Sequence, residues 1–77
     1  MKDLVEYIVK GLVDNPDQVV LNENKGEQMD IIEINVAEGD AGKVIGKEGR
    51  TINAIRTLVK AAAAKQDRRV SVELMAK

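Results

Sequence analysis

The segment GKEGR at residues 46–50 is the part of this sequence best suited to bind a ligand. Glycine has no Cβ, so its backbone can take positive φ angles and a large anionic ligand can approach it closely. A helix that begins just after Gly49 would add free N–H groups and a partial positive charge, and Lys47 and Arg50 add two full charges. This combination predicts a site for a sugar-phosphate backbone, with the bases directed over an adjacent groove. That groove would be lined by Val44, Ile45 and Ile52.

Other phosphate-binding loops do not fit this segment. A P-loop needs four residues between its glycines, followed by Gly-Lys-Ser/Thr. Here Ala41 stands at the first glycine position and Glu48 replaces the hydroxyl residue, and the alternative around Gly42 fails in the same way at Ala37. The dinucleotide fingerprint needs a third glycine where Val44 stands. What remains is Gly-x-x-Gly joining two helices.

Apolar periodicity predicts the elements that would position this segment. Apolar residues at i, i+4 and i+8 indicate an amphipathic helix near the N-terminus, which Pro16 stops, and short alternating runs indicate strands. Asp40 is placed to cap a short helical turn before the glycines. In chain order we expect a helix over 3–13, strands over 18–22 and 31–36, the turn over 41–45, a long helix over 50–65 and a strand over 70–74. The order α-β-β-α-α-β indicates one two-layer α+β domain over residues 1–77, with the first two strands in a hairpin.

The composition excludes several classes of function. The 77 residues contain no Cys and no His, which removes disulfides, the usual transition-metal ligands and the commonest general base. The acidic residues are scattered, so we expect no catalysis, no metal site and no cofactor. No apolar run is long enough to span a membrane, and we expect a soluble, cytoplasmic protein. With 12 basic and 13 acidic residues, the net charge of −1 argues neither for nor against nucleic acid.

The stretch VIGKEGRTI at residues 44–52 resembles the central signature of KH domains, aliphatic-Ile-Gly-x-x-Gly-x-x-Ile. The element order is similar to the type II, prokaryotic arrangement. A chain that consists of little else, with GKVIGKEGRTINAIRTLV at its centre, resembles the KhpA family of small bacterial KH-domain proteins. The resemblance implies a KH type II-like fold, with a three-stranded sheet and three helices packed on one face. It also implies single-stranded RNA as the ligand, with the loop clamping the backbone of about four nucleotides.

The resemblance also implies which residues contact RNA. Gly46 and Gly49 would form the clamp, Lys47 and Glu48 its variable pair, and aliphatic groove residues would replace aromatic stacking platforms. Glu48 departs from the pattern, because many KH loops carry a neutral or basic residue there. The expected RNA-binding residues are Lys43, Val44, Ile45, Gly46, Lys47, Glu48, Gly49, Arg50, Thr51, Ile52 and Asn53.

Protein partners are implied as well. The family resemblance implies self-association and pairing with a larger KH-containing protein of the KhpB (Jag) type, in a role as RNA chaperone or post-transcriptional regulator linked to cell elongation and division. The run Ala61–Ala64 offers a small-residue helix surface, so the long helix is the candidate interface. Its expected dimer residues are Leu58, Ala61, Ala62 and Lys65. The alternative is a degenerate KH fold that acts only as a protein-interaction module.

Other side chains have plainer interpretations. We expect Arg56 and Lys60 to form a solvated helix face rather than an extension of the basic surface. Arg68 and Arg69 follow the long helix and would complement its dipole. The single aromatic residue, Tyr7, is expected to be partly buried with its hydroxyl exposed.

Overall fold

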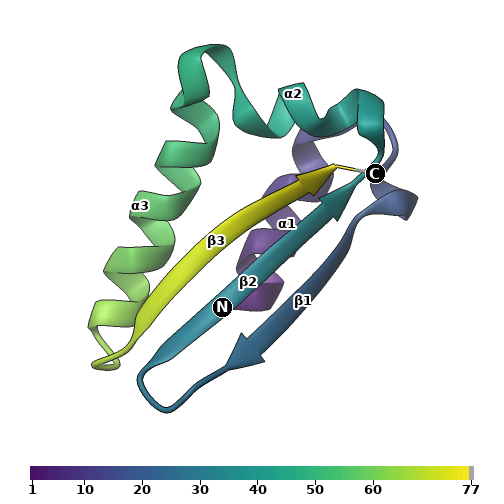
Figure 1. Cartoon of the computed structure of the whole chain (residues 1–77). Coiled ribbons are helices and arrows are strands. Elements are labelled where there is room, and N and C mark those ends of the chain that lie inside the picture. The colour runs from purple at the N-terminus through teal and green to yellow at the C-terminus, as the bar shows by residue number, and fades with distance from the viewer. Residues whose placement is uncertain (77) are drawn as a thin grey trace.

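The computed structural model describes residues 1–76 and has the expected α+β order of elements (Figure 1). Three single 3₁₀ turns, η1 (Pro16–Gln18), η2 (Glu38–Asp40) and η3 (Lys47–Gly49), lie between the main elements. The main elements are α1 (Lys2–Leu12), β1 (Val20–Lys25), β2 (Met29–Val36), α2 (Ala41–Ile45), α3 (Arg50–Ala64) and β3 (Arg69–Ala76).

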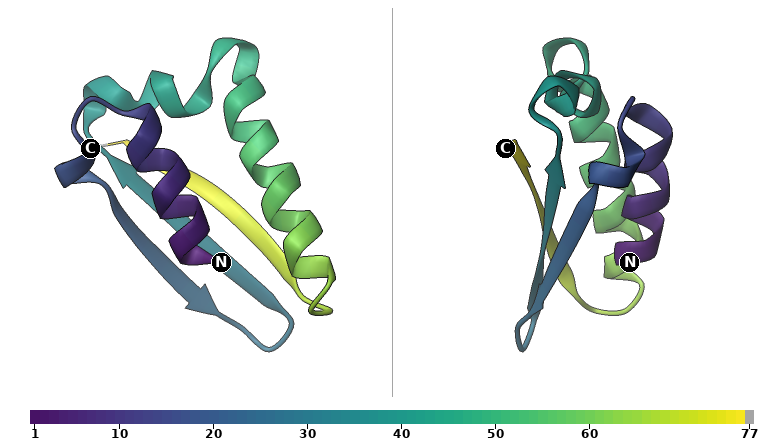
Figure 2. Two further views of the ribbon diagram at one scale, coloured as in Figure 1. Left: turned by 180° about the vertical axis from the view of Figure 1, so that it is seen from behind. Right: turned by 90° about the vertical axis from the view of Figure 1, so that its right-hand side faces the viewer.

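The three strands form one mixed sheet in the order β1-β2-β3. β1 and β2 are an antiparallel hairpin with Leu21 opposite Ile34, whereas β3 runs parallel to β2 with Val72 opposite Ile32. A parallel pair needs a crossover connection, and here α2 and α3 supply it. The helices lie on one side of the sheet and leave its other face open (Figure 2). This is the KH type II-like arrangement that the sequence predicts.

The core fills the space between the sheet and the helices. Alternate residues of β2 point inward and are buried, because successive side chains in a strand point to opposite faces. Each fully buried Val or Ile contributes about 1.5–3 kcal/mol of transfer free energy. The least exposed core side chains are Val5 and Val9 of α1, Ile32, Ile34 and Val36 of β2, Val44 of α2 and Val59 of α3.

The expected strands are right in number and order but wrong at their ends. Gln18 belongs to η1, not to the first strand, and β1 starts at Val20 and continues through polar residues to Lys25. These polar residues stay in the strand because each pairs with a residue of β2, up to Lys25 opposite Asp30. β2 and β3 both start earlier than expected, since Met29 pairs with Arg69. Backbone pairing, rather than side-chain pattern, sets these boundaries.

The helices match closely. α1 ends at Leu12 and α3 at Ala64, one residue before each expected end, and Val13 is already extended. Tyr7 is 80% exposed, so the expectation that it is partly buried is wrong. Tyr7 lies on the side of α1 away from Val5 and Val9, which face the sheet. Within residues 1–76, every helix is too short or too polar to cross a membrane.

Candidate nucleic-acid interface

The GKEG segment forms a projecting corner between α2 and α3 (Figure 1). Gly46 leaves α2 with φ 76° and ψ 176°, and Gly49 enters α3 with φ 77°. The Gly49 N–H donates to the Gly46 carbonyl at 3.2 Å, which closes the turn. Both glycines therefore have positive φ angles, which residues with a Cβ avoid. Within residues 1–76, the N–H groups of Lys47 and Glu48 make no backbone hydrogen bond.

Gly46 is required by space as well as by conformation. A Cβ at this position would lie 2.1 Å from Thr51 Oγ1 and 2.9 Å from the Thr51 backbone nitrogen. The half-buried Thr51 thus packs directly against the turn. Gly49 differs, since the nearest atom to its Cβ position is Asn53 Nδ2 at 3.7 Å. At Gly49 the positive φ alone disfavours other residues.

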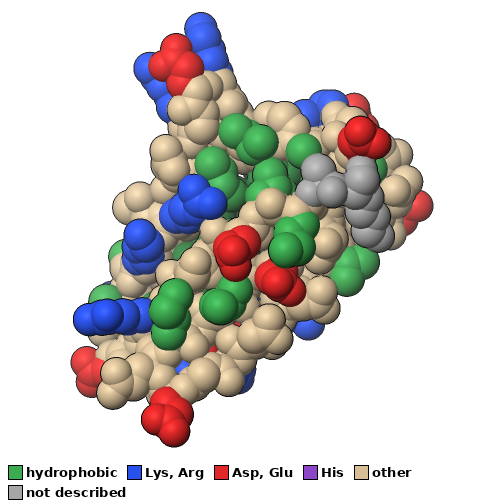
Figure 3. Space-filling view, viewed as in Figure 1, with side chains coloured by type: hydrophobic (Ala, Val, Ile, Leu, Met, Phe, Trp, Pro, Cys, Tyr) green, Lys and Arg blue, Asp and Glu red, His purple; other side chains and the backbone are tan. Residues whose placement is uncertain are grey.

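Charges surround this corner on the solvent side. Lys47, Glu48 and Arg50 are all exposed, and basic and acidic side chains stand together at the projecting tip in Figure 3. Glu48 itself adopts φ 57°, a conformation that is uncommon for a residue with a long side chain. The corner has a net positive charge from its side chains, to which the N-terminal end of the 15-residue helix α3 adds.

Lys43 is held by acidic residues, unlike the cations of the corner. Its Nζ lies 3.1 Å from Asp14 Oδ2 and 3.6 Å from Asp40 Oδ1. The hydrogen bond to Asp14 raises the pKa of Lys43 above its ordinary value, and the nearby Asp40 charge adds to this. The charge expected for an RNA phosphate is therefore largely engaged within the protein.

Asp40 occupies the expected N-cap position of α2, but its side chain makes no capping hydrogen bond and instead joins α2 to the segment after α1. Its carboxylate is buried and accepts hydrogen bonds from the Asn15 N–H at 3.0 Å, from Asn15 Nδ2 at 3.1 Å and from the Asp14 N–H. Burial acts to raise the pKa of Asp40, but these hydrogen bonds outweigh it, and the pKa is lowered overall. This network fixes where α2 starts and so helps to orient the corner that follows.

The expected groove of three aliphatic residues is only partly present. Val44 is fully buried and Ile52 is 6% exposed, so both pack into the core, and their contact with bases stays a prediction. The groove is expected from the position of these residues beside the glycines, and that position does not say which way a side chain points. Ile45, at 39% exposed, is the member that offers an apolar surface next to the corner, and Asn53 is exposed one turn into α3.

Arg56 contradicts the expectation of a solvated helix face. Its Nε donates to the Val72 carbonyl at 3.1 Å, and the residue is half-buried. The guanidinium therefore links α3 to the outer edge of β3. Lys60 follows four residues later and is exposed. Asn53, Arg56 and Lys60 are three and four residues apart, so they lie on one face of a helix. This spacing is the feature of the sequence that indicates a polar surface beside the corner.

Arg68 has specific hydrogen-bond partners, whereas from the sequence we expect it only to complement the dipole of the long helix. Its side chain donates to Asp30 Oδ2 at 2.9 Å and to the Gly26 and Glu27 carbonyls at 2.9 and 3.3 Å, which ties the β1–β2 hairpin to the end of α3. The Arg68 hydrogen bond lowers the pKa of Asp30. The two residues are 38 positions apart, so nothing local in the sequence indicates the pair.

The expected dimer residues lie on one outer face of α3 and at Lys65, which directly follows it. Leu58 is 57% exposed, Ala61 and Lys65 are exposed, and Ala62 is half-buried. Their spacing of three, four and seven residues forms a single stripe.

Comparison with known proteins places this geometry in a family. The family description "KhpA/KhpB, KH domain" matches residues 2–74. The RNA-binding protein KhpA of Caldanaerobacter subterraneus subsp. tengcongensis is 60% identical over 75 residues, which cover 97% of this chain and all of that protein. The proteins of the same name from Clostridium acetobutylicum and Chlamydia trachomatis serovar D are 56% and 53% identical, over 97% of this chain and 100% and 96% of their own length. No solved structure matched the chain.

Proposed function

Because the chain belongs to the KhpA/KhpB family of KH domains, we propose that it binds single-stranded RNA through the GKEG corner. The observation that carries this proposal is the exposed turn Gly46–Gly49, with the N–H groups of Lys47 and Glu48 facing no backbone acceptor within residues 1–76. Those N–H groups and the side chains of Lys47 and Arg50 would contact phosphates. KH loops clamp about four nucleotides in this way.

The remaining contacts follow from what lies beside the corner. Ile45 offers an apolar surface to a base, and Asn53 offers an amide to a base edge or a sugar. Thr51 supports the turn behind Gly46. Val44 and Ile52 act through the core, and Lys43 acts through Asp14 and Asp40. Binding would thus depend on backbone and charge more than on base identity, and we expect low sequence specificity.

We propose a non-catalytic role as an RNA chaperone or post-transcriptional regulator in the cytoplasm, by a single KH domain over residues 1–77. Self-association through the α3 stripe, and pairing with a KhpB (Jag)-type protein in cell elongation and division, belong to the same proposal. The exposed Leu58 beside small alanines supports the interface, since small residues let another helix approach closely. Sedimentation of Leu58→Glu tests it: a dimer that persists in this variant refutes the stripe as the interface.

The central experiment replaces Lys47 and Glu48 with aspartates and titrates both proteins against oligouridine. We expect the parent to bind and the variant to lose binding, with the circular dichroism spectrum and oligomeric state unchanged. If two or three phosphates are neutralised, log K of the parent falls with log salt at a slope of about −1.4 to −2.1. A parent without RNA affinity at low salt would instead favour the protein-interaction module.

A further inference from the structure

The face of the sheet that the helices leave open is partly apolar (Figure 2). Alternate side chains of the strands point to this face, because their neighbours are buried on the other side. All-parallel sheets usually have both faces covered, yet within residues 1–76 the parallel pair β2–β3 is covered on one face alone. The apolar side chains of the open face are Val20, Met29 and Met75, each nearly half exposed, and the half-buried Ile31.

Two glutamates lie at the centre of this open face. Glu33 of β2 and Glu73 of β3 are register partners on adjacent strands, which lie about 4.8 Å apart. Figure 3 shows acidic side chains in the middle of the sheet with hydrophobic side chains around them. Neither glutamate forms an ion pair in the described part of the chain, so the two charges repel each other without compensation. A local conflict of this kind is expected at a functional surface.

The acidic pair decides which kind of partner suits the open face. It would repel phosphates, so this face differs from the GKEG corner and is a poor surface for RNA. A symmetric contact between two copies would bring the glutamate pairs of both copies together, which is also unfavourable. A cation between apolar groups would instead neutralise Glu33 and Glu73 and cover the apolar side chains around them.

A helix is the element that fits this surface, because helices cover the faces of sheets in layered folds. Along β2, Ile31 and Asn35 lie on either side of Glu33 and are about 13 Å apart, a length that about eight or nine helical residues span. Helix residues four apart share one face. A helix with two apolar residues about eight positions apart and a Lys or Arg midway would therefore place its cation over the glutamates.

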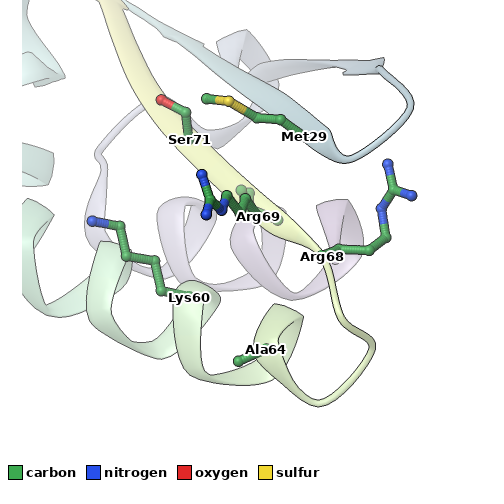
Figure 4. A pocket seen from close by; sticks show the side chains of 7 residues that line it. Met29, Lys60, Ala64, Arg68, Arg69 and Ser71 are labelled. Atoms are coloured by element: carbon green, nitrogen blue, oxygen red, sulfur yellow. The ribbon is translucent and has the colours of Figure 1, made fainter.

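The end of the open face near Met29 carries the opposite charge. There Met29, Arg69 and Ser71 line a hollow of about 530 Å³ together with Lys60 of α3 (Figure 4). Lys60 and Arg69 are exposed, and neither has an ion-pair partner among residues 1–76. Arg69 lies four residues before Glu73, about 13 Å along the strand, which corresponds to about two turns of a helix. An acidic side chain two turns from the central cation would therefore meet two cations here.

We propose that the open sheet face binds a basic amphipathic helix of another protein. Its Lys or Arg lies over the Glu33–Glu73 pair, and its apolar residues lie over Ile31 on one side and over Val20 and Met75 on the other. The contact uses neither the GKEG corner nor the α3 stripe, so it stands independently of the proposed RNA binding. Through it, one chain holds RNA and a protein at the same time.

The test uses an amphipathic peptide of about four turns, made of Ala with two Leu about eight positions apart and Lys midway between them. A matched peptide has Glu in place of Lys. Each peptide, and separately oligouridine, is titrated into the isotopically labelled full chain, and amide NMR shifts report both affinity and location. The variant Glu33→Gln/Glu73→Gln removes the acidic pair. The control Asp3→Asn/Glu6→Gln makes the same charge change on α1, on the opposite side of the sheet.

We expect the Lys peptide to shift amides of β2 and β3 and to bind more tightly than the Glu peptide. Glu33→Gln/Glu73→Gln should weaken its binding by about fourfold to twenty-fivefold, since each exposed ion pair contributes a factor of about two to five. The control should bind as the parent does. Val20→Thr should also weaken binding, because it removes apolar contact. Because the charge repulsion is lost, the Tm of Glu33→Gln/Glu73→Gln should equal or exceed that of the parent.

Several results would overturn the proposal. A parent that does not bind the Lys peptide, binds both peptides equally or binds with shifts confined to the helices has no such site on its sheet. The same holds if Glu33→Gln/Glu73→Gln binds as tightly as the parent. Shifts of the β2 and β3 amides with oligouridine would assign the face to RNA, and a change in sedimentation caused by Glu33→Gln/Glu73→Gln would assign it to a second copy of the chain. A loss of RNA binding at the corner would leave this proposal unaffected.

Discussion

The two ends of α3 are built alike but use their charges in opposite ways. At the N-terminal end, the GKEG corner has Glu48 at φ 57° and exposed Lys47 and Arg50 beside it. At the C-terminal end, Asp67 has φ 55° and is followed by Arg68 and Arg69. The second turn is closed by the Arg68 N–H donating to the Ala63 carbonyl at 3.0 Å, a common way of ending a helix.

The difference lies in where the cations find partners. Arg68 bonds Asp30 and two hairpin carbonyls, and so joins parts of the chain that are distant in sequence. The cations of the corner have no such partner within residues 1–76, and the N–H groups of Lys47 and Glu48 make no backbone hydrogen bond there. A tight turn with adjacent basic residues therefore does not by itself mark a binding site. The proposed site at the corner depends on exposed charge together with backbone donors that lack a partner.

The largest effect should come from Gly46→Ala. The new Cβ would collide with Thr51 and would hold a positive φ that costs about 1–2 kcal/mol even without the collision. We expect RNA binding to be lost and the free energy of unfolding to fall by more than that amount. The matched control is Gly42→Ala in α2, where a Cβ meets nothing within 4 Å. Urea denaturation and RNA titration of both variants provide the measurement, and equal behaviour of the two would contradict the role of Gly46.

The helices, the strands and the GKEG corner could be predicted from the sequence, because each depends on residues close together in the chain. The six main elements follow from apolar spacing, and the corner follows from two glycines between helices. The contacts of Arg68 with Asp30 and of Asp40 with Asn15 could not be predicted, since the partners are 38 and 25 positions apart and meet only in the fold. Val44 and Ile52 flank the loop in the sequence, and this position alone does not say whether the sheet or a ligand covers their side chains.

The next largest effect should be a difference in stability between variants of two neighbouring arginines, Arg68 and Arg69. Arg68→Gln should lower the Tm, because Asp30 and the hairpin carbonyls lose their donor, while RNA binding of the folded protein stays close to that of the parent. Arg69→Gln should leave the Tm unchanged, because Arg69 is exposed and forms no ion pair within residues 1–76. Thermal melts and salt titrations of both variants test the contrast, and it fails if Arg68→Gln melts like the parent.

Low pH should lower the stability that the carboxylates of Asp30 and Asp40 provide. The pKa of Asp30 is lowered by Arg68, and that of Asp40 is lowered overall because hydrogen bonds from Asn15 outweigh its burial. Their contribution to stability is therefore fully present above the ordinary aspartate pKa of about 3.9, and it disappears as the pH falls through the lower pKa of the folded state. We expect Asp30→Asn to destabilise the protein at pH 7 and to approach the parent at low pH. Urea midpoints across this range measure it, with the exposed Asp17→Asn as control; a constant difference between Asp30→Asn and the parent would contradict it.

The smallest effect compares the two left-handed residues themselves. Glu48 and Asp67 have positive φ angles, which cost about 1–2 kcal/mol for a residue with a Cβ and which glycine adopts without that cost. Glycine also increases the conformational entropy of the unfolded chain, and this offsets roughly half of the gain. Both Glu48→Gly and Asp67→Gly should therefore stabilise the fold by about 1 kcal/mol or less. Only Glu48→Gly removes a carboxylate beside the proposed phosphates, so it alone should raise RNA affinity, by about fivefold at most. Glu48→Gln, which removes the charge and keeps the side chain, should give the affinity gain without the gain in stability. If Asp67→Gly strengthens RNA binding as much, the gain arises from overall stability. If Glu48→Gln weakens binding, the carboxylate of Glu48 is itself a contact, and the corner recognises more than phosphate.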